Sequence, residues 1–131
     1  MLHPNQFEVD EAWIAFQLND QPIHTEQDGD FNFLALMDAA SCFILASTLV
    51  AATQAEPTRR EAKRLLKEGQ VHEKRWPKTL FIPSGQGAQS MIAEAGRLGI
   101  GVVRVAKEQL LPFIGEAQEG FRERFGARRA Q

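Results

Sequence analysis

The sequence predicts a single domain of the α/β class, built on a mixed five-stranded sheet with helices on both faces. Two apolar stretches stand back to back in the first half, at 31–37 and 42–50. Helix-like and strand-like segments alternate after them, which is typical of parallel strands joined by helical crossovers. The 131 residues contain no repeat and no Gly/Ser-rich linker, so we expect one domain with a core of about 12–125 and flexible ends at 1–10 and 126–131.

The first half predicts three strands. Residues 12–18 mix aromatic and branched side chains, and the two apolar stretches are apolar on both faces, as in interior strands. Residues 19–30 are rich in Asp, Gly and Pro and are expected to form a loop. The short sequence Asp-Ala-Ala-Ser at 38–41 is the turn between the second and third strands.

The second half predicts helices and strands in alternation. Apolar residues at i, i+3 and i+4 predict a helix with Pro57 in its first turn, ending at Gly69 or running on to Lys74 before Trp76-Pro77. The remaining elements are a strand at 79–82, a helix with Gly99 at its C′ position, a strand at 100–105, and a last helix over 110–125 with Pro112 near its start.

Composition excludes several classes of protein. A hydrophobic content of 44% and a charged content of 24% fit a folded globular chain. Cys42 is the one cysteine, which excludes an intramolecular disulfide and a zinc site of several thiolates; we expect a buried, unreactive thiol. Asp38 interrupts the apolar stretch at a cost of about 3 kcal/mol in lipid, so we predict a hairpin there and no membrane contact. Without a signal peptide at its start, we expect a cytoplasmic protein.

Charge is divided unevenly along the chain. Residues 1–58 hold nine acids and no Lys or Arg, while residues 59–131 hold fifteen basic residues and eight acids, giving −9 and +7. This division fits an acidic and a basic face on one fold, or subunits that pair head to tail.

Two segments carry a resemblance to a known family. The segment 33–47 runs Phe-Leu-Ala-Leu-Met-Asp-Ala-Ala-Ser-Cys-Phe-Ile-Leu-Ala-Ser and resembles the hairpin of the second and third strands in retroviral integrase and transposase cores, with Cys42 where that turn usually has glycine. The segment 76–85 is similar to their fourth strand. The resemblance spans 12–105 and implies a ribonuclease H-like fold in the order strand, strand, strand, helix, strand, helix, strand, helix. It also suggests a bacterial family with a degenerate core.

The resemblance implies a site where carboxylates hold two divalent ions about 3.5–4 Å apart. Its first-strand position falls near Phe16 or Gln17, and its fourth-strand position falls on Pro83 or Ser84. Neither a hydroxyl nor a proline replaces the anionic oxygen that a hard cation requires. We therefore predict a non-catalytic domain without a cofactor.

An alternative hypothesis keeps an enzyme. A divalent-metal-dependent phosphodiester hydrolase could use Asp20, Asp38 and the helical Glu116 in a non-standard geometry, with Glu119 and Glu123 as further helical candidates. Against this, an aspartate in a hairpin turn more often caps the turn by accepting backbone hydrogen bonds.

Two segments are candidates for binding charged ligands. The run 59–78 holds eight basic residues against three glutamates, a pattern that serves either phosphate binding or a solvated helix face. Its basic residues are Arg59, Arg60, Lys63, Arg64, Lys67, Lys74, Arg75 and Lys78. The turn with Ser84, Gly85 and Gly87 precedes a helix and is a candidate anion site or a plain tight turn. We expect the domain to bind a protein partner or copies of itself, with nucleic acid as a weaker ligand.

Overall fold

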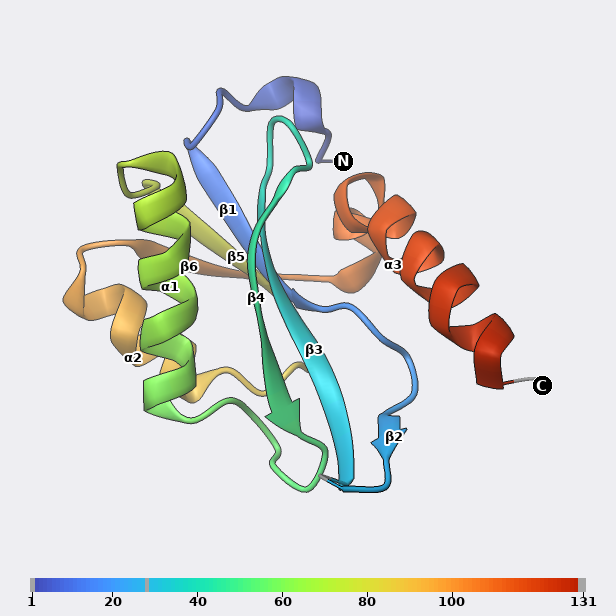
Figure 1. The fold of residues 1–131 in the computed structure, drawn as a ribbon. Helices are drawn as coiled ribbons and strands as arrows, with labels where there is room; N and C mark the ends of the chain where they lie inside the picture. The colour runs from blue at the N-terminus through green and yellow to red at the C-terminus, as the bar shows by residue number, and fades with distance from the viewer. Residues whose placement is uncertain (1, 28, 130–131) are drawn as a thin grey trace.

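The computed structural model describes residues 2–27 and 29–129, with side chains up to residue 124. Helices α1 and α2 cover one face of a mixed sheet, and α3 covers the other (Figure 1). The elements are η1 (Pro4–Gln6), β1 (Ala12–Gln17), β2 (Ile23–Thr25), β3 (Gly29–Asp38), β4 (Ile44–Ala51), α1 (Arg59–Glu73), β5 (Thr79–Pro83), α2 (Gln89–Arg97), β6 (Gly101–Val105) and α3 (Lys107–Arg129).

The long strand β3 organises the sheet. It runs antiparallel to β4 along one edge and antiparallel to β1 and β2 along the other, since Phe31 pairs with both Ile23 and Ala51. Strands β1, β5 and β6 then continue the sheet in parallel. The predicted mixed sheet with helices on both faces is confirmed.

Strand β2 is a sixth strand that the sequence analysis expected to be loop. Its three residues pair with the start of β3, and the hairpin is fastened by His24 Nδ1 and Asp30 Oδ1 at 2.5 Å and by a bond of 2.9 Å from Thr25 Oγ1 to the Gly29 carbonyl. Gly29 has φ +82°, so the residues that indicate a turn do form one. The strand is too short and polar to produce a periodic signal.

The hairpin between β3 and β4 also differs from its expected limits. The sequence analysis started the third strand at residue 42, whereas β4 begins at Ile44. Cys42 lies in the turn with φ +59°, in the left-handed region that glycine adopts most easily. The resemblance to integrase cores had placed glycine at this position of the turn.

Helix α1 begins at Arg59, two residues after Pro57, which the sequence analysis placed in its first turn. Thr58 is its N-cap and forms a capping box with Glu61, so Pro57 precedes the cap. The helix continues past Gly69, where an added Cβ would stand 2.7 Å from Leu36 Cδ2. It ends at Glu73, and its C-cap Lys74 has a left-handed conformation with φ +64°. Gly69 thus serves close packing of the helix on the sheet.

Two apolar layers enclose the sheet. Trp13, Leu36 and Leu65 belong to the layer under α1 and α2, and Phe16 and Phe113 belong to the layer under α3.

The segment before β1 is tied to the layer under α3. The ring of Phe7 lies 5.7 Å from that of Phe81 and 5.9 Å from that of Phe113, measured between ring centroids. These contacts anchor a segment that the pattern alone predicted to be loosely held. Across residues 2–27 and 29–129, no helix has the length and apolar character needed to cross a membrane.

Candidate functional site

A hollow of about 280 Å³ lies where β1 and β5 end beside α3. The sequence analysis located the first-strand and fourth-strand metal positions here. Its lining residues are Phe16, Gln17, Asn19, Asp20, Pro83, Ser84, Gln86, Lys107, Ile114 and Gln118. We call this hollow the β1–β5 site.

In the β1–β5 site, the side-chain amides of glutamine residues form hydrogen bonds with the backbone. The amide N of Gln17 donates to Gln86 Oε1 at 3.0 Å, and Gln86 Nε2 donates to the Ala15 carbonyl at 3.4 Å. Gln118 Nε2 on α3 donates to the Gln17 carbonyl at 3.0 Å. The Gln17 side chain donates to the Asn19 carbonyl at 2.7 Å. These groups join β1, α3 and the turn after β5, and they carry no charge.

The donor set of the β1–β5 site does not fit a two-metal centre, which requires several anionic oxygens. Asp20 is the single carboxylate in the lining, and Lys107 contributes a positive charge. The Asp20 carboxylate accepts from Arg122 Nη2 at 2.7 Å and from Arg122 Nε at 3.0 Å. Among the residues described, no three His, Cys, Asp or Glu side chains converge in a way that could hold a metal ion.

Asp38 is fully buried in the hairpin and acts as its cap. Oδ1 accepts the Asp10 amide at 2.8 Å, and Oδ2 accepts the amide of Ser41 at 2.9 Å and its hydroxyl at 2.7 Å. Both carboxylate oxygens are therefore used within the chain. Asp38 lines neither the β1–β5 site nor the hollow that contains Glu116.

Glu116 lines a separate hollow of about 540 Å³ between α3 and the β3–β4 hairpin, together with Glu119, Glu123 and the thiol of Cys42. Cys42 is partly exposed, where the sequence analysis expected it to be buried. Partial burial, with the negative charges of Asp38 and Glu116, raises the pKa of the thiol. The thiol therefore stays protonated and weakly nucleophilic at neutral pH.

The turn before α2 is held by the chain's own groups. Gly85 has φ +87°, and a Cβ on Gly87 would stand 2.4 Å from the Ala55 carbonyl oxygen, so this backbone approach requires glycine. The amide of Ser90, in the first turn of α2, donates to Glu56 Oε1 at 2.8 Å. An anion at this helix N-terminus would compete with the Glu56 carboxylate.

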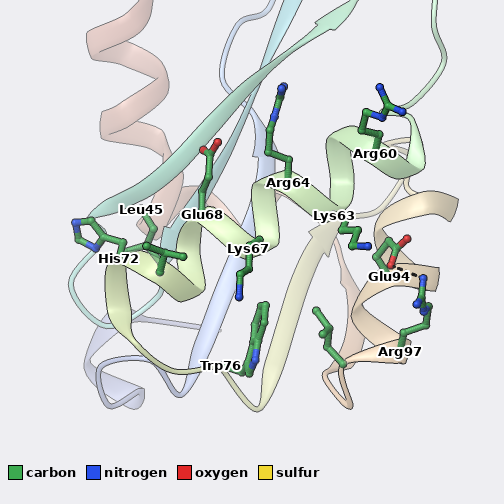
Figure 2. Close-up of a pocket in the computed structure, with 12 residues that line it drawn as sticks. Leu45, Arg60, Lys63, Arg64, Lys67, Glu68, His72, Trp76, Glu94 and Arg97 are labelled. Carbon is green, nitrogen blue, oxygen red and sulfur yellow. Dashed lines mark hydrogen bonds and ion pairs between the residues drawn. The ribbon is translucent and has the colours of Figure 1, made fainter.

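A hollow of about 900 Å³ lies along α1, and we call it the α1 surface (Figure 2). Its lining carries five basic side chains and two glutamates over an apolar floor. The lining residues are Leu45, Arg60, Lys63, Arg64, Lys67, Glu68, Val71, His72, Trp76, Glu94, Arg97 and Leu98.

The cations of the α1 surface lie on both flanks of the helix. Figure 2 shows Arg60 and Arg64 on one flank and Lys63 and Lys67 on the other, where Lys67 points toward Trp76. Arg64 Nη2 donates to Thr48 Oγ1 on β4 at 2.9 Å, which holds this guanidinium over the edge of the sheet. The floor includes exposed apolar side chains, with Val71 63% and Leu98 41% accessible.

Two acidic groups line the α1 surface: Glu68 stands beside Arg64 on α1, and Glu94 lies at the α2 end (Figure 2). Glu94 is nearly buried and lies 3.4 Å from Arg97 Nη1 and 3.5 Å from Arg59 Nε. Arg97 comes from α2 and was missed by the sequence analysis, because nothing in a linear sequence indicates that α2 lies beside α1.

The rest of the basic run lies outside the α1 surface. Lys74 caps α1, and neither it nor Lys78 belongs to the lining. Arg75 donates to Asp10 Oδ2 at 3.1 Å and to the Val9 carbonyl at 2.7 Å. Its role is to fasten the segment before β1, so the eight predicted basic residues do not form one interface.

Two solved structures of similar fold are those of an integrase core domain and an intasome. The catalytic core domain of BIV integrase matches with a TM-score of 0.56 and 13% identity, over 92% of this chain and 72% of that chain. The simian T-cell lymphotropic virus intasome, solved in complex with the PP2A regulatory subunit B56 gamma, matches with a TM-score of 0.57 and 15% identity. The protein has a ribonuclease H-like fold.

The likeness of this ribonuclease H-like domain to integrases is one of fold. The chain spans 37% of the intasome chain, over 85% of its own length. No protein-family model and no curated protein matches the sequence.

Proposed function

We propose that this ribonuclease H-like domain is non-catalytic and works by binding a negatively charged protein partner along the α1 surface. The observation that carries the proposal is the contrast in charge: neutral amides stand where metal-binding acids would be needed, while five basic side chains surround an open apolar floor.

The donor chemistry of the β1–β5 site supports the proposal that the domain is non-catalytic. Amide oxygens that already accept hydrogen bonds from the backbone give a dication no negative charge to offset its dehydration. The guanidinium of Arg122 would oppose a cation near Asp20. The alternative of a metal-dependent phosphodiester hydrolase would need Asp20, Asp38 and Glu116 to rearrange into one group.

The α1 surface favours an acidic protein segment over nucleic acid. Phosphates would satisfy the cations but leave the exposed Val71 and Leu98 without apolar contacts. Trp76, the aromatic ring of the floor, packs 6.3 Å from Trp13 between ring centroids and is partly buried, which limits its use in base stacking. A protein segment with both carboxylates and apolar side chains would match both parts of the surface.

Fluorescence anisotropy tests this proposal with two probes: a labelled peptide that alternates glutamate and valine, and a labelled DNA duplex. We expect the peptide to bind at low salt, and the combined substitution Arg60→Gln, Lys63→Gln, Arg64→Gln and Lys67→Gln to weaken it at least tenfold. The matched control carries Lys74→Gln and Lys78→Gln, which lie outside the lining. Equal loss in both variants, or tighter binding of the duplex with a steep salt dependence, would contradict the proposal.

A nuclease assay tests the enzymatic alternative. Supercoiled plasmid incubated with the protein and Mg²⁺ or Mn²⁺ should stay intact. Cleavage that disappears in Asp20→Asn but persists in a Glu26→Gln control would establish a non-standard metal site instead.

A further inference from the structure

Strand β4 is an edge strand whose pairing with β3 shifts register opposite Leu36 and Met37, but runs without a break from Ala46 to Ala51. Among the described strands it pairs with β3 alone. Its eight residues, Ile-Leu-Ala-Ser-Thr-Leu-Val-Ala, include no charge, proline or glycine. Proteins usually blunt such an edge with lysine, proline or a bulge that prevents pairing with another chain. Here Ile44 and Leu49 are 38% and 43% accessible along the edge.

Along β4, alternate residues direct their backbone N–H and C=O groups away from β3. The amide of Ala52 donates to the Asp30 carbonyl at 2.9 Å, and the amide of Leu18 donates to the Phe33 carbonyl at 2.8 Å. Because donors alternate along antiparallel strands, even-numbered residues of β3 bond toward β4 and odd-numbered ones toward β1. By the observed register, Ser47 and Leu49 then direct their amide and carbonyl groups away from β3.

The two faces beside this edge differ in chemistry. On the α1 side, Thr48 accepts from Arg64, and Figure 2 shows Arg60 on the same flank of the helix together with one acidic residue, Glu68, so cations outnumber acids there by two to one. On the opposite side, Ile44 and Leu49 expose apolar surface. An added strand would therefore meet cations with one set of alternate side chains and apolar groups with the other.

We infer that β4 accepts an extended partner segment, added as a further strand, in which acidic residues alternate with apolar ones. This inference rests on the proposed function and specifies its ligand. A second copy of the chain fits less well, because β4 itself offers no carboxylate to Arg60 and Arg64. Pairing two β4 strands would instead bring the basic α1 helices of both copies together.

Proline substitutions separate this inference from the broader proposal. Ser47→Pro and Leu49→Pro each remove one outward N–H while leaving the hydrogen bonds to β3 in place. We expect each substitution to lower the affinity for the glutamate–valine peptide at least tenfold, while Ser47→Thr binds the peptide as the wild type does. A peptide alternating lysine and valine should bind at least tenfold more weakly than the glutamate–valine peptide.

Amide hydrogen exchange of the wild-type protein provides a second measurement that needs no variant. Saturating glutamate–valine peptide should slow exchange at Ser47 and Leu49 at least tenfold. If the α1 variants lose binding but the prolines do not and exchange is unchanged, the proposed function stands and the added strand is wrong. If no variant alters binding, or the peptide does not bind at millimolar concentration, both are wrong. A dimer by light scattering that Leu49→Pro dissociates would show that a second copy occupies the edge and would overturn the inference.

Discussion

The β1–β5 site and the α1 surface use polar side chains in opposite ways. In the β1–β5 site, Gln17, Gln86 and Gln118 bond to the chain's own backbone and connect three elements. Along the α1 surface, Lys63 and Lys67 extend from the helix beside an accessible apolar floor. The first region is internally satisfied and contributes to stability, while the second keeps charge and apolar area accessible to a partner.

This difference shows that polar residues in one small fold can serve two separate purposes. The sheet and its three helices match integrase cores at 13–15% identity. The polar residues at the ends of β1 and β5 connect elements of the fold, so substitutions there should lower stability. Substitutions along α1 should lower affinity instead.

The largest expected effect belongs to Asp38, which the metal hypothesis and the capping account interpret differently. Asp38→Ala removes the acceptor of three hydrogen bonds and leaves the buried Asp10 amide unpaired. We expect the free energy of unfolding to fall by about 3 kcal/mol or more, measured by urea denaturation. Asp20→Asn is the control and should change stability far less. A small effect of Asp38→Ala would refute its role as a structural cap.

The next largest effect is expected for Gln86→Ala, which tests whether the β1–β5 site and the α1 surface are independent. It removes the bonds of Gln86 with Gln17 and Ala15, so we expect a loss of about 1–2 kcal/mol in urea denaturation. Affinity for the glutamate–valine peptide should not change. Arg64→Gln should show the reverse, with stability within about 0.5 kcal/mol of the wild type and weaker binding. Weaker binding in Gln86→Ala would mean that the two regions are not independent.

Lys74→Gly should stabilise the protein. Lys74 ends α1 in the left-handed region, which glycine adopts without the steric cost of a Cβ. We expect a gain of about 1 kcal/mol in the free energy of unfolding by urea denaturation. Peptide affinity should stay the same because Lys74 does not line the α1 surface. Lys74→Ala keeps the Cβ and serves as the control, without the gain.

The smallest effect concerns Glu73, the last residue of α1. Burial and a hydrogen bond with Asp10 raise the pKa of the Glu73 carboxyl. The native state therefore holds this proton more tightly than the unfolded chain, and stability falls as pH rises through the interval above the ordinary pKa of 4.5. Glu73→Gln should be more stable than the wild type at pH 7, and the advantage should vanish below the ordinary pKa. Urea denaturation at several pH values, with the exposed Glu68→Gln as control, tests this; an unchanged advantage at low pH would exclude the raised pKa as its cause.

The sequence was sufficient for the order of the longer elements because each of them carries a local signal. The apolar stripe of α1, the left-handed Gly99 after α2 and the two-sided apolar character of β3 are all visible within a few residues. Strand β2 was missed because three residues are fewer than any periodicity requires. The turn role expected for Asp38 was likewise local and agrees with its bonds to Ser41.

The site was less predictable because its contacts connect distant parts of the chain. Gln17 meets Gln118 across 101 positions, and Arg75 meets Asp10 across 65. Arg75 looks like any other member of a basic run until the fold brings Asp10 beside it. The sequence showed that the expected positions on the first and fourth strands hold no acid. It did not show that Gln17, Gln86 and Gln118 form hydrogen bonds there.

The central claim is that the ends of β1 and β5 do not bind divalent metal. Paramagnetic line broadening by Mn²⁺ in amide NMR spectra tests it directly. We predict that the amides of Gln17, Ser84 and Gln118 broaden no more than those of exposed residues elsewhere on the surface. Selective broadening of these three amides at micromolar Mn²⁺ would show a metal site there and would contradict the account.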